Sequence, residues 1–555
     1  MIKSSMIAVV LFAGAEGALA QQAPDAGQQI QQIPQPPVVK RPSSDILFDT
    51  PTTRDEVAVA GPKVRVNAIE VTGATLFSAE ELISAAGFTP GSELNLSDLR
   101  NIASRVARYY NDRGYFLAQA YVPAQNIESG IINIAVVEGR YGSVDLRNQS
   151  RLKDNVARGV LAGLGSSDIV ESATLERRLL LLSDIQGVAV RSTLAPGSAV
   201  GTTDLIVDIT PGRSVSGSVE ADNAGNRYTG PYRLGGSVYF NNLTGSGDVA
   251  SLRILASNLG LLYGRASYQT LLGNASVGVA YARVNYELGR EFKSLDARGS
   301  ADIFSVFGSY PVIRSRNANL YALGAFEARY LEDRIGVTSM RTNRNIHALT
   351  AGLRGDQRDA LGPGGWSTYS VGATWGKLDI DTPENRAVDA LSSNRNGSYG
   401  KLQMSVAHLQ HIAGPLSFFG AIRGQIASKN LDSSEQMALG GAYGVRAYPE
   451  GEAYGDQGYI ANVEARYLLP DVSNALPGRI QLIGFVDIGE VTIAKTPWYV
   501  GANNARRKGY GAGILWSNPN DFLITATYAR QLGNQLATSA PDRSGRLWLQ
   551  FVKLF

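Results

Sequence analysis

The sequence predicts a transmembrane β-barrel preceded by two small α+β domains. Two patterns carry this prediction: residues 213–555 contain segments of about ten residues with alternating apolar and polar positions, and residues 63–212 repeat one α+β pattern twice. The composition agrees, with 61 glycines, 25 tyrosines, no cysteine and a mean hydropathy of −0.08. Barrel strands dilute hydrophobicity in this way because polar lumen residues alternate with lipid-facing residues.

The N-terminus has the pattern of a secretory signal peptide over residues 1–20. Lys3 precedes an apolar run from Met6 to Ala13, and Ala18-Leu19-Ala20 offers a small-x-small cleavage site. A short buried helix is the alternative interpretation of this run. Export without a later apolar helix leaves a periplasmic, a secreted or an outer-membrane β-barrel protein. The formal charge of +3 is too small to indicate nucleic-acid binding.

Residues 21–62 are predicted to form a linker. The segment is rich in Gln, Pro and small residues, includes the run Pro34-Gln35-Pro36-Pro37, and shows little apolar periodicity. Only residues 28–33 favour a helix, between Pro24 and Pro34. The segment therefore contains either a short helix or none.

Residues 63–138 show a β-α-α-β-β pattern. A strand is expected at residues 64–71, followed by a short helix that begins with a capping box at Ser78 and ends before Gly87. The apolar stripe of a second helix ends at Gly114. Two more strands are expected at residues 115–122 and 131–137.

Residues 139–212 repeat this order. Helices are expected near residues 152–161 and 174–182, and strands near residues 188–194 and 204–210. The two units form a tandem pair of roughly 75 residues each.

The remaining residues, 213–555, have the length and pattern of a membrane barrel. Transmembrane strands need about nine to eleven residues, so this span has room for about 16 strands with their loops. The last segment, residues 547–555, alternates and ends at Phe555.

A glycine-rich stretch and a later strand predict an ion pair inside the barrel. The stretch supplies the cation, in the run Val445, Arg446, Ala447 and Tyr448. The strand supplies the carboxylate within an otherwise apolar pattern, in Phe485, Asp487 and Gly489. An Arg on a long loop and an Asp on a nearby strand favour a salt bridge that pins the loop in the lumen.

These two motifs resemble the VRG(Y/F) loop tip and the FxDxG strand of the outer-membrane polypeptide-transport superfamily. The resemblance implies an inward-folded sixth loop, 16 strands and an Arg446–Asp487 pair across the lumen, either as a brace or as part of a gate. It also implies a helix at the mature N-terminus that plugs the barrel; here residues 28–33 form this plug helix or it is absent. Ala447 stands where the superfamily usually has Gly. The tandem units resemble POTRA domains. Phe555 is similar to the terminal signal that barrel-assembly machinery recognises. Lys553 stands at a position of this signal that is usually aromatic or apolar.

A further motif distinguishes among members of this superfamily. It lies at the start of the barrel and resembles the DNxGxxxTG signature of TpsB transporters, with Asp222, Asn223, Gly225, Thr229 and Gly230. A lone DNxG predicts only a turn. The resemblance extends from Val64 to Phe555 and implies two-partner secretion, in which the barrel exports one large TpsA-like adhesin or haemolysin.

The resemblance also implies where the protein lies and what it contacts. We expect an outer-membrane barrel in contact with lipid, with POTRA domains in the periplasm that bind an unfolded client by adding it to a sheet edge. A spacer role is the alternative for these domains. An insertase for membrane proteins is the main rival function, and a passive porin is a second.

The sequence offers no catalytic or metal-binding pattern and implies no cofactor. It lacks a phosphate-binding GxxxxGK loop and a GxSxG elbow. Its three histidines do not form a metal motif, because His408 and His411 are expected on opposite faces of one strand. The five tryptophans are expected at membrane girdles or strand ends, with sugar binding as an alternative: Trp366, Trp375, Trp498, Trp516 and Trp548.

Overall fold

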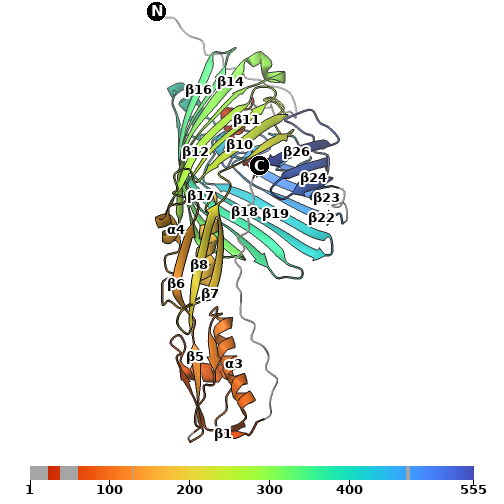
Figure 1. The fold of residues 1–555 in the computed structure, drawn as a ribbon. Coiled ribbons are helices and arrows are strands. Elements are labelled where there is room, and N and C mark those ends of the chain that lie inside the picture. The colour runs from red at the N-terminus through yellow and green to blue at the C-terminus, as the bar shows by residue number, and fades with distance from the viewer. Residues whose placement is uncertain (1–22, 38–60, 128, 471–475) are drawn as a thin grey trace, which may run out of the picture.

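The computed structural model describes residues 23–37, 61–127, 129–470 and 476–555. The predicted signal peptide and most of the predicted linker lie outside these residues. Within them, no helix combines the length and the apolar character needed to cross a membrane. Figure 1 shows the arrangement: a barrel, the α+β unit of residues 139–212 against one of its ends, and the α+β unit of residues 63–138 beyond that.

The first unit has two helices packed on a small sheet. Its sheet has the order β2-β5-β4, with β2 parallel to β5, while β1 pairs separately with β3. The bounds are β1(Val64–Val66), β2(Ala68–Thr72), α2(Ala79–Ala86), β3(Ser92–Leu94), α3(Leu96–Asp112), β4(Gln119–Tyr121) and β5(Ile131–Val137). The expected strand at 64–71 is split, because the amides of Asn67 and Ala68 both donate to the carbonyl of Gly130. The expected strand at 115–122 shrinks to β4, because Tyr115 and Ala118 are held in a turn after α3.

The second unit repeats this architecture with longer strands. Its sheet has the order β6-β8-β7, with β6 parallel to β8. The bounds are β6(Arg140–Asn148), α4(Asp154–Val160), α5(Ser172–Ser183), β7(Val188–Pro196) and β8(Thr202–Pro211). Leucines of α5, including Leu175 and Leu182, fill its core.

The two units are joined through direct contacts. Phe116 and Leu117 of the first unit pack against the core of the second. The amide of Ser172 donates to the carbonyl of Gly114 at 2.9 Å, and Arg140 Nη2 donates to Thr75 Oγ1 at 3.2 Å. The joint is therefore built from packed side chains as well as from the chain connection.

The barrel is closed and has 16 antiparallel strands, so the predicted fold class is confirmed. Adjacent strands pair in sequence order, and β26 closes the barrel on β9. This closing seam is short, with five residue pairs against 18 between β15 and β16. The strands are β9(Val215–Asp222), β10(Arg233–Asn241), β11(Val249–Ser257), β12(Leu262–Leu272), β13(Ala275–Glu287), β14(Ala297–Arg314), β15(Ala318–Ile335), β16(Met340–Asp359), β17(Gly365–Ile380), β18(Gly397–Ala413), β19(Leu416–Ala427), β22(Gln457–Leu468), β23(Arg479–Thr492), β24(Asn504–Asn518), β25(Phe522–Gln531) and β26(Arg546–Leu554).

Several short elements occupy the loops. The chain between β19 and β22, residues 428–456, is named the lumen loop here; it holds the 3₁₀ turn η2(Ser433–Glu435) and the small pair β20(Met437–Ala438) and β21(Tyr454–Gly455). Two other loops carry η1(Arg290–Leu295) and α6(Pro383–Ala390), and one helix precedes the α+β units, α1(Ala26–Gln31).

The second unit is docked on the barrel end where β9 begins. Arg314, at the end of β14, pairs with Asp184 through two hydrogen bonds of 2.8 and 2.9 Å. Arg177 of α5 donates to the carbonyls of Pro311 and Val312, each at 2.8 Å. This contact fixes the α+β units at one end of the barrel, which the resemblance to POTRA domains leads us to expect at the periplasmic side.

Candidate functional site in the barrel lumen

The lumen loop folds into the barrel and forms a buried core with its wall. Leu439, Val445, Ala447 and Tyr448 are fully buried there against side chains of β22, β23 and β24. The wall leaves room for the loop at glycines: a Cβ on Gly489 would lie 2.6 Å from Leu439 Cδ1. The sequence-predicted loop motif and strand motif are thus brought together.

Arg446 and Asp487 form the centre of this contact. Arg446 Nη2 lies 2.7 Å from Asp487 Oδ1, and both its Nε and its backbone amide donate to Asp487 Oδ2, at 2.9 and 3.1 Å. Asp487 is fully buried. Because three donors from one residue converge on one carboxylate, they hold the loop tip in position, and the guanidinium also balances the charge of Asp487.

Two neighbours complete this pair: Glu464, which was not predicted from the sequence, and Phe485 of the predicted strand motif. Glu464 of β22 accepts a hydrogen bond of 2.8 Å from Arg446 Nη1, and the Phe485 ring lies under the guanidinium, 3.5 Å from ring centre to Cζ. A Cβ on Gly511 would lie 2.5 Å from Phe485 Cζ, so this glycine makes room for the ring. Glu464 could have been found from alternation along β22, which points it into the lumen with Asn462.

Trp548 lies near the start of β26, a strand end as predicted, but it does not face a membrane girdle. The structure buries it in the lumen, where its indole N–H donates to the carbonyl of Arg446 at 2.7 Å. A buried indole needs such an acceptor. The last strand, β26, is thereby tied to the loop tip.

The Asp-Asn motif lies at the extracellular end of the closing seam. Asp222 Oδ1 accepts from Arg233 Nε and from the amide of Ala224, both at 2.8 Å. The Asn223 side chain reaches across to β26: its Nδ2 donates to the carbonyl of Leu547 at 2.9 Å, and its Oδ1 accepts from the amide of Leu549 at 2.8 Å. Asn223 therefore extends the strand pairing where β9 ends.

The rest of this motif forms the turn from β9 to β10 and contacts α1. Gly230 has a positive φ of 113°, and Gly225 lies so close to the carbonyl of Gly230 that no side chain fits. Thr229 Oγ1 donates to Gln29 Oε1 at 3.0 Å, and Arg233 Nη1 donates to the carbonyl of Gln32 at 2.8 Å.

Helix α1 lies inside the barrel. The sequence favoured residues 28–33, and the structure has Ala26–Gln31, because the Asp25 side chain caps the helix by accepting from the amide of Gln28 at 3.0 Å. Arg344 of β16 binds this cap residue together with Asp333 and Asp432. Gly27 packs against Ser433 and Ser434 with no room for a side chain.

Phe555 ends the chain at the periplasmic end of the seam. Its backbone exchanges hydrogen bonds of 3.0 and 3.1 Å with Gly217 of β9. Gly217 also makes room for the aromatic ring. Nearby, Lys553 forms an ion pair with Asp521, so the unusual lysine has a partner at the rim.

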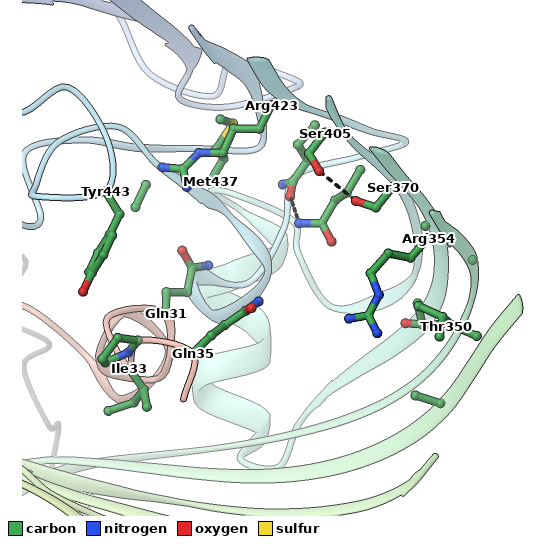
Figure 2. A pocket seen from close by; sticks show the side chains of 18 of the residues that line it. Gln31, Ile33, Gln35, Thr350, Arg354, Ser370, Ser405, Arg423, Met437 and Tyr443 are labelled. Atoms are coloured by element: carbon green, nitrogen blue, oxygen red, sulfur yellow. Dashed lines mark hydrogen bonds between the residues drawn. The ribbon is translucent and has the colours of Figure 1, made fainter. Parts of the chain in front are cut away.

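Below α1 the lumen contains a cavity of about 1220 Å³. Figure 2 shows polar side chains from several strands pointing into it, together with Gln31, Ile33 and Gln35 from the chain around α1. In the part of the chain that the structure describes, no group of three His, Cys, Asp or Glu is arranged to hold a metal ion. The arrangement is a blocked channel with a polar interior.

Two protein-family models match this sequence. The model of the haemolysin secretion/activation protein ShlB/FhaC/HecB matches residues 201–514, more than half of the chain, and the ShlB-type POTRA domain model matches residues 64–139. The chain belongs to the ShlB/FhaC/HecB family. It is therefore an outer-membrane transporter of the TpsB type for secretion of a partner protein, with POTRA domains that lie in the periplasm.

Individual relatives agree with this family. The heme/hemopexin transporter protein HuxB of Haemophilus influenzae (strain 86-028NP) is 30% identical, over 84% of this chain and 82% of its own. The outer membrane transporter CdiB of Dickeya dadantii (strain 3937) is 23% identical, over 72% of each chain. The solved structure of CdiB from Escherichia coli has a TM-score of 0.73 at 20% identity, covering 92% of this chain and 94% of that one, which shows a shared fold.

Proposed function

We propose that this TpsB transporter binds its unfolded partner protein through a POTRA sheet edge and passes it through the lumen to the cell surface. The observation that carries the proposal is the lumen itself: α1 and the lumen loop block it, and only hydrogen bonds, ion pairs and packing hold them. Such contacts can be exchanged for others, so both segments are able to shift without breaking a covalent bond.

A free strand edge supports the binding step. In the second POTRA unit, β7 pairs with β8 on one side only and leaves its other edge open over nine residues. An extended chain can add to such an edge through main-chain hydrogen bonds, with little demand on its sequence. This suits a client that is unfolded when it reaches the barrel.

The partner that we propose is one large TpsA-like protein of the adhesin or haemolysin class. The name of HuxB refers to heme/hemopexin, and that ligand belongs to HuxB. We propose no catalytic role and no nucleotide for this chain; folding of the partner outside the cell supplies direction, because burial of its apolar surface is favourable. Outer-membrane lipid surrounds the barrel, and barrel-assembly machinery recognises Phe555.

Arg446 has two candidate roles: it braces the barrel, or it forms part of the gate. Loss of one partner of a buried ion pair costs about 3–5 kcal/mol, and water in the lumen reduces this. If Arg446 is a brace, the barrel should not fold stably without its side chain; if it is part of the gate, the barrel should still fold.

The experiment measures secretion of the protein encoded beside this gene. Wild type is compared with Arg446→Ala and with a deletion of residues 64–138, and barrel folding is followed by heat-modifiable gel migration. Lost secretion with a folded barrel supports a transporter in which the loop tip and the first POTRA unit act. Unchanged secretion in both variants contradicts the mechanism, loss of the folded barrel assigns Arg446 to stability, and depletion of many outer-membrane proteins favours an insertase.

A further inference from the structure

The cavity below α1 is lined by two arginines that form no ion pair with a described residue, although Glu450 attracts one of them, Arg423. Arg354 of β16 and Arg423 of β19 are exposed to it, and Figure 2 shows both side chains pointing inward. Among the described residues, no carboxylate lies within ion-pair distance of either. Other lumen arginines differ: Arg233, Arg344 and Arg446 each bind at least one carboxylate.

The rest of the lining is almost uncharged. It combines glycine and apolar residues with amide and hydroxyl side chains, among them Gln269, Gln403, Gln425, Gln436, Gln550, Thr350, Ser370 and Ser405. Two further cations, Arg233 and Lys401, line the cavity, and both are paired, with Asp222 and Glu435. Glu450 of the lumen loop is the one carboxylate among the described lining residues.

Glu450 offsets only part of this charge. Burial raises the pKa of its carboxyl to about 7, against the attraction of Arg233 and Arg423. The carboxyl is therefore only partly ionised at neutral pH. The cavity keeps a net positive charge from Arg354 and Arg423.

The protein's own chain shows what this space accommodates. After α1, residues 34–37 continue along the cavity without helix or strand structure, and Ile33, Pro34, Gln35 and Pro37 line it. All four side chains are uncharged. An uncharged segment without helix or strand structure is thus accommodated in the same cavity as the two arginines.

Unpaired cations in a narrow lumen act on any charge that enters. The low-dielectric barrel wall strengthens their field, which attracts carboxylates and repels ammonium and guanidinium groups. A client segment that carries Lys or Arg must also lose part of its hydration there, and among the described lining residues only the partly ionised Glu450 offers a carboxylate to compensate.

We propose that Arg354 and Arg423 form an electrostatic filter, which passes acidic and neutral segments of the partner protein readily and slows segments rich in Lys or Arg. This inference rests on the proposed function, because it takes the lumen as the route of the client. It names the chemical class of chain that the route favours.

The first arm of the test needs no client. The full chain carrying Gly27→Leu, which prevents α1 from seating, is inserted in planar bilayers, and its reversal potential is measured in a KCl gradient. The parent should prefer chloride; R354Q/R423Q should lower the chloride-to-potassium permeability ratio by at least about twofold, and R354E/R423E should bring it below one. The control R105Q/R158Q, which removes two exposed charges from the POTRA helices, should leave the ratio unchanged.

The second arm uses two versions of the client with a short insert, either Glu-Ser repeats or Lys-Ser repeats. Wild type should export the Glu version more than the Lys version, R354Q/R423Q should narrow this difference, and R354E/R423E should reverse it. Heat-modifiable migration checks each barrel, and the Gln variant provides the test if the Glu variant does not fold. A parent without chloride preference, or an export ratio that the variants leave unchanged, overturns the filter. Failure to export either version of the client contradicts the proposed function instead. In that case the bilayer experiment still determines whether the lumen is positively charged.

Discussion

Ala447 and Gly509 share one small space between the lumen loop and β24. Ala447 stands where the superfamily usually has Gly, and a Cβ on Gly509 would lie 2.5 Å from Ala447 Cβ. Gly509→Ala should therefore overpack the loop tip and destabilise the barrel by about 1–3 kcal/mol. The temperature of the heat-modifiable gel shift measures this loss.

The second residue of that pair provides the control. Ala447→Gly in the Gly509→Ala background should restore the shift temperature, because it removes the methyl group that collides. If the double variant is as unstable as Gly509→Ala alone, the space between these residues is not what Gly509 provides.

Asn223 stabilises the closing seam between β9 and β26. Its amide bridges β26 where only five residue pairs close the barrel, so Asn223→Ala should expose the amide of Leu549. Hydrogen exchange of the full chain in detergent should show faster exchange there than in wild type. Asn223→Asp keeps the acceptor and loses the donor to Leu547, so it should protect Leu549 better than Ala does; equal exchange in all three proteins would contradict this role.

At the scale of elements, α1 depends on one glycine. Gly27 lies against Ser433 and Ser434 of η2, and a Cβ would lie 2.5 Å from the Ser434 amide nitrogen. Gly27→Leu should displace α1 from the lumen and raise ion conductance in planar bilayers. Gly61→Leu is the matched control, because a side chain there meets nothing within 4 Å; low conductance in both variants would show that α1 does not block the channel.

The first POTRA unit depends on a buried carboxylate. Glu138 accepts from the amides of Thr75 and Leu76, at 2.6 and 2.9 Å, and from Tyr110 Oη at 3.0 Å. Burial acts to raise the pKa of Glu138, but these hydrogen bonds outweigh it and leave the pKa below its ordinary value of 4.5. A carboxyl with a lowered pKa stabilises the fold above its unfolded-state pKa and loses this effect as the pH falls through the folded value.

Glu138→Gln should therefore cost about 1–3 kcal/mol at neutral pH and much less in acid. Thermal unfolding of the full chain in detergent, followed by proteolysis within residues 63–138, measures the difference. The melting temperatures of wild type and variant should converge as the pH falls below 4.5. A difference that stays constant with pH would assign the effect to shape alone.

Helices and strands could be predicted from the sequence where local signals determine them. Contacts that form only when the barrel closes could not. The Ser78 cap and Gly87 bound α2 as expected, since a cap and a left-handed glycine act within one turn. The start of α1 at Ala26 was missed, because Asp25 was not recognised as its cap. Alternation alone could not show that Trp548 faces the loop tip, since that contact joins residues about a hundred positions apart.

At the scale of the whole molecule, the blocked lumen and the POTRA arm are mechanically connected. The second unit touches the barrel at the end of β14, the cavity opens below α1, and the first unit is packed on the second. Figure 1 shows the resulting arm extending from one end of the barrel. A client held on this arm is thereby kept close to the periplasmic opening, which raises its effective concentration there.

The contact of Asp184 and Arg177 with the barrel should set the direction of this arm. The chain has no cysteine, so Val200→Cys and Leu361→Cys, at 98% and 73% exposure, provide two unique spin-label positions on the second unit and on the turn between β16 and β17. In wild type the distance between the labels should have a narrow distribution. Asp184→Ala with Arg177→Ala removes four hydrogen bonds to the barrel and should broaden it.

Secretion should fall together with the broadening, while heat-modifiable migration stays normal, because the barrel strands are untouched. Arg283→Gln with Asp302→Asn removes an exposed ion pair at the other end of the barrel and should change neither measurement. A distribution that stays narrow in the Asp184 variant would show that the short connection from β8 to β9 alone directs the arm. In that case docking on β14 would have no part in delivering the client.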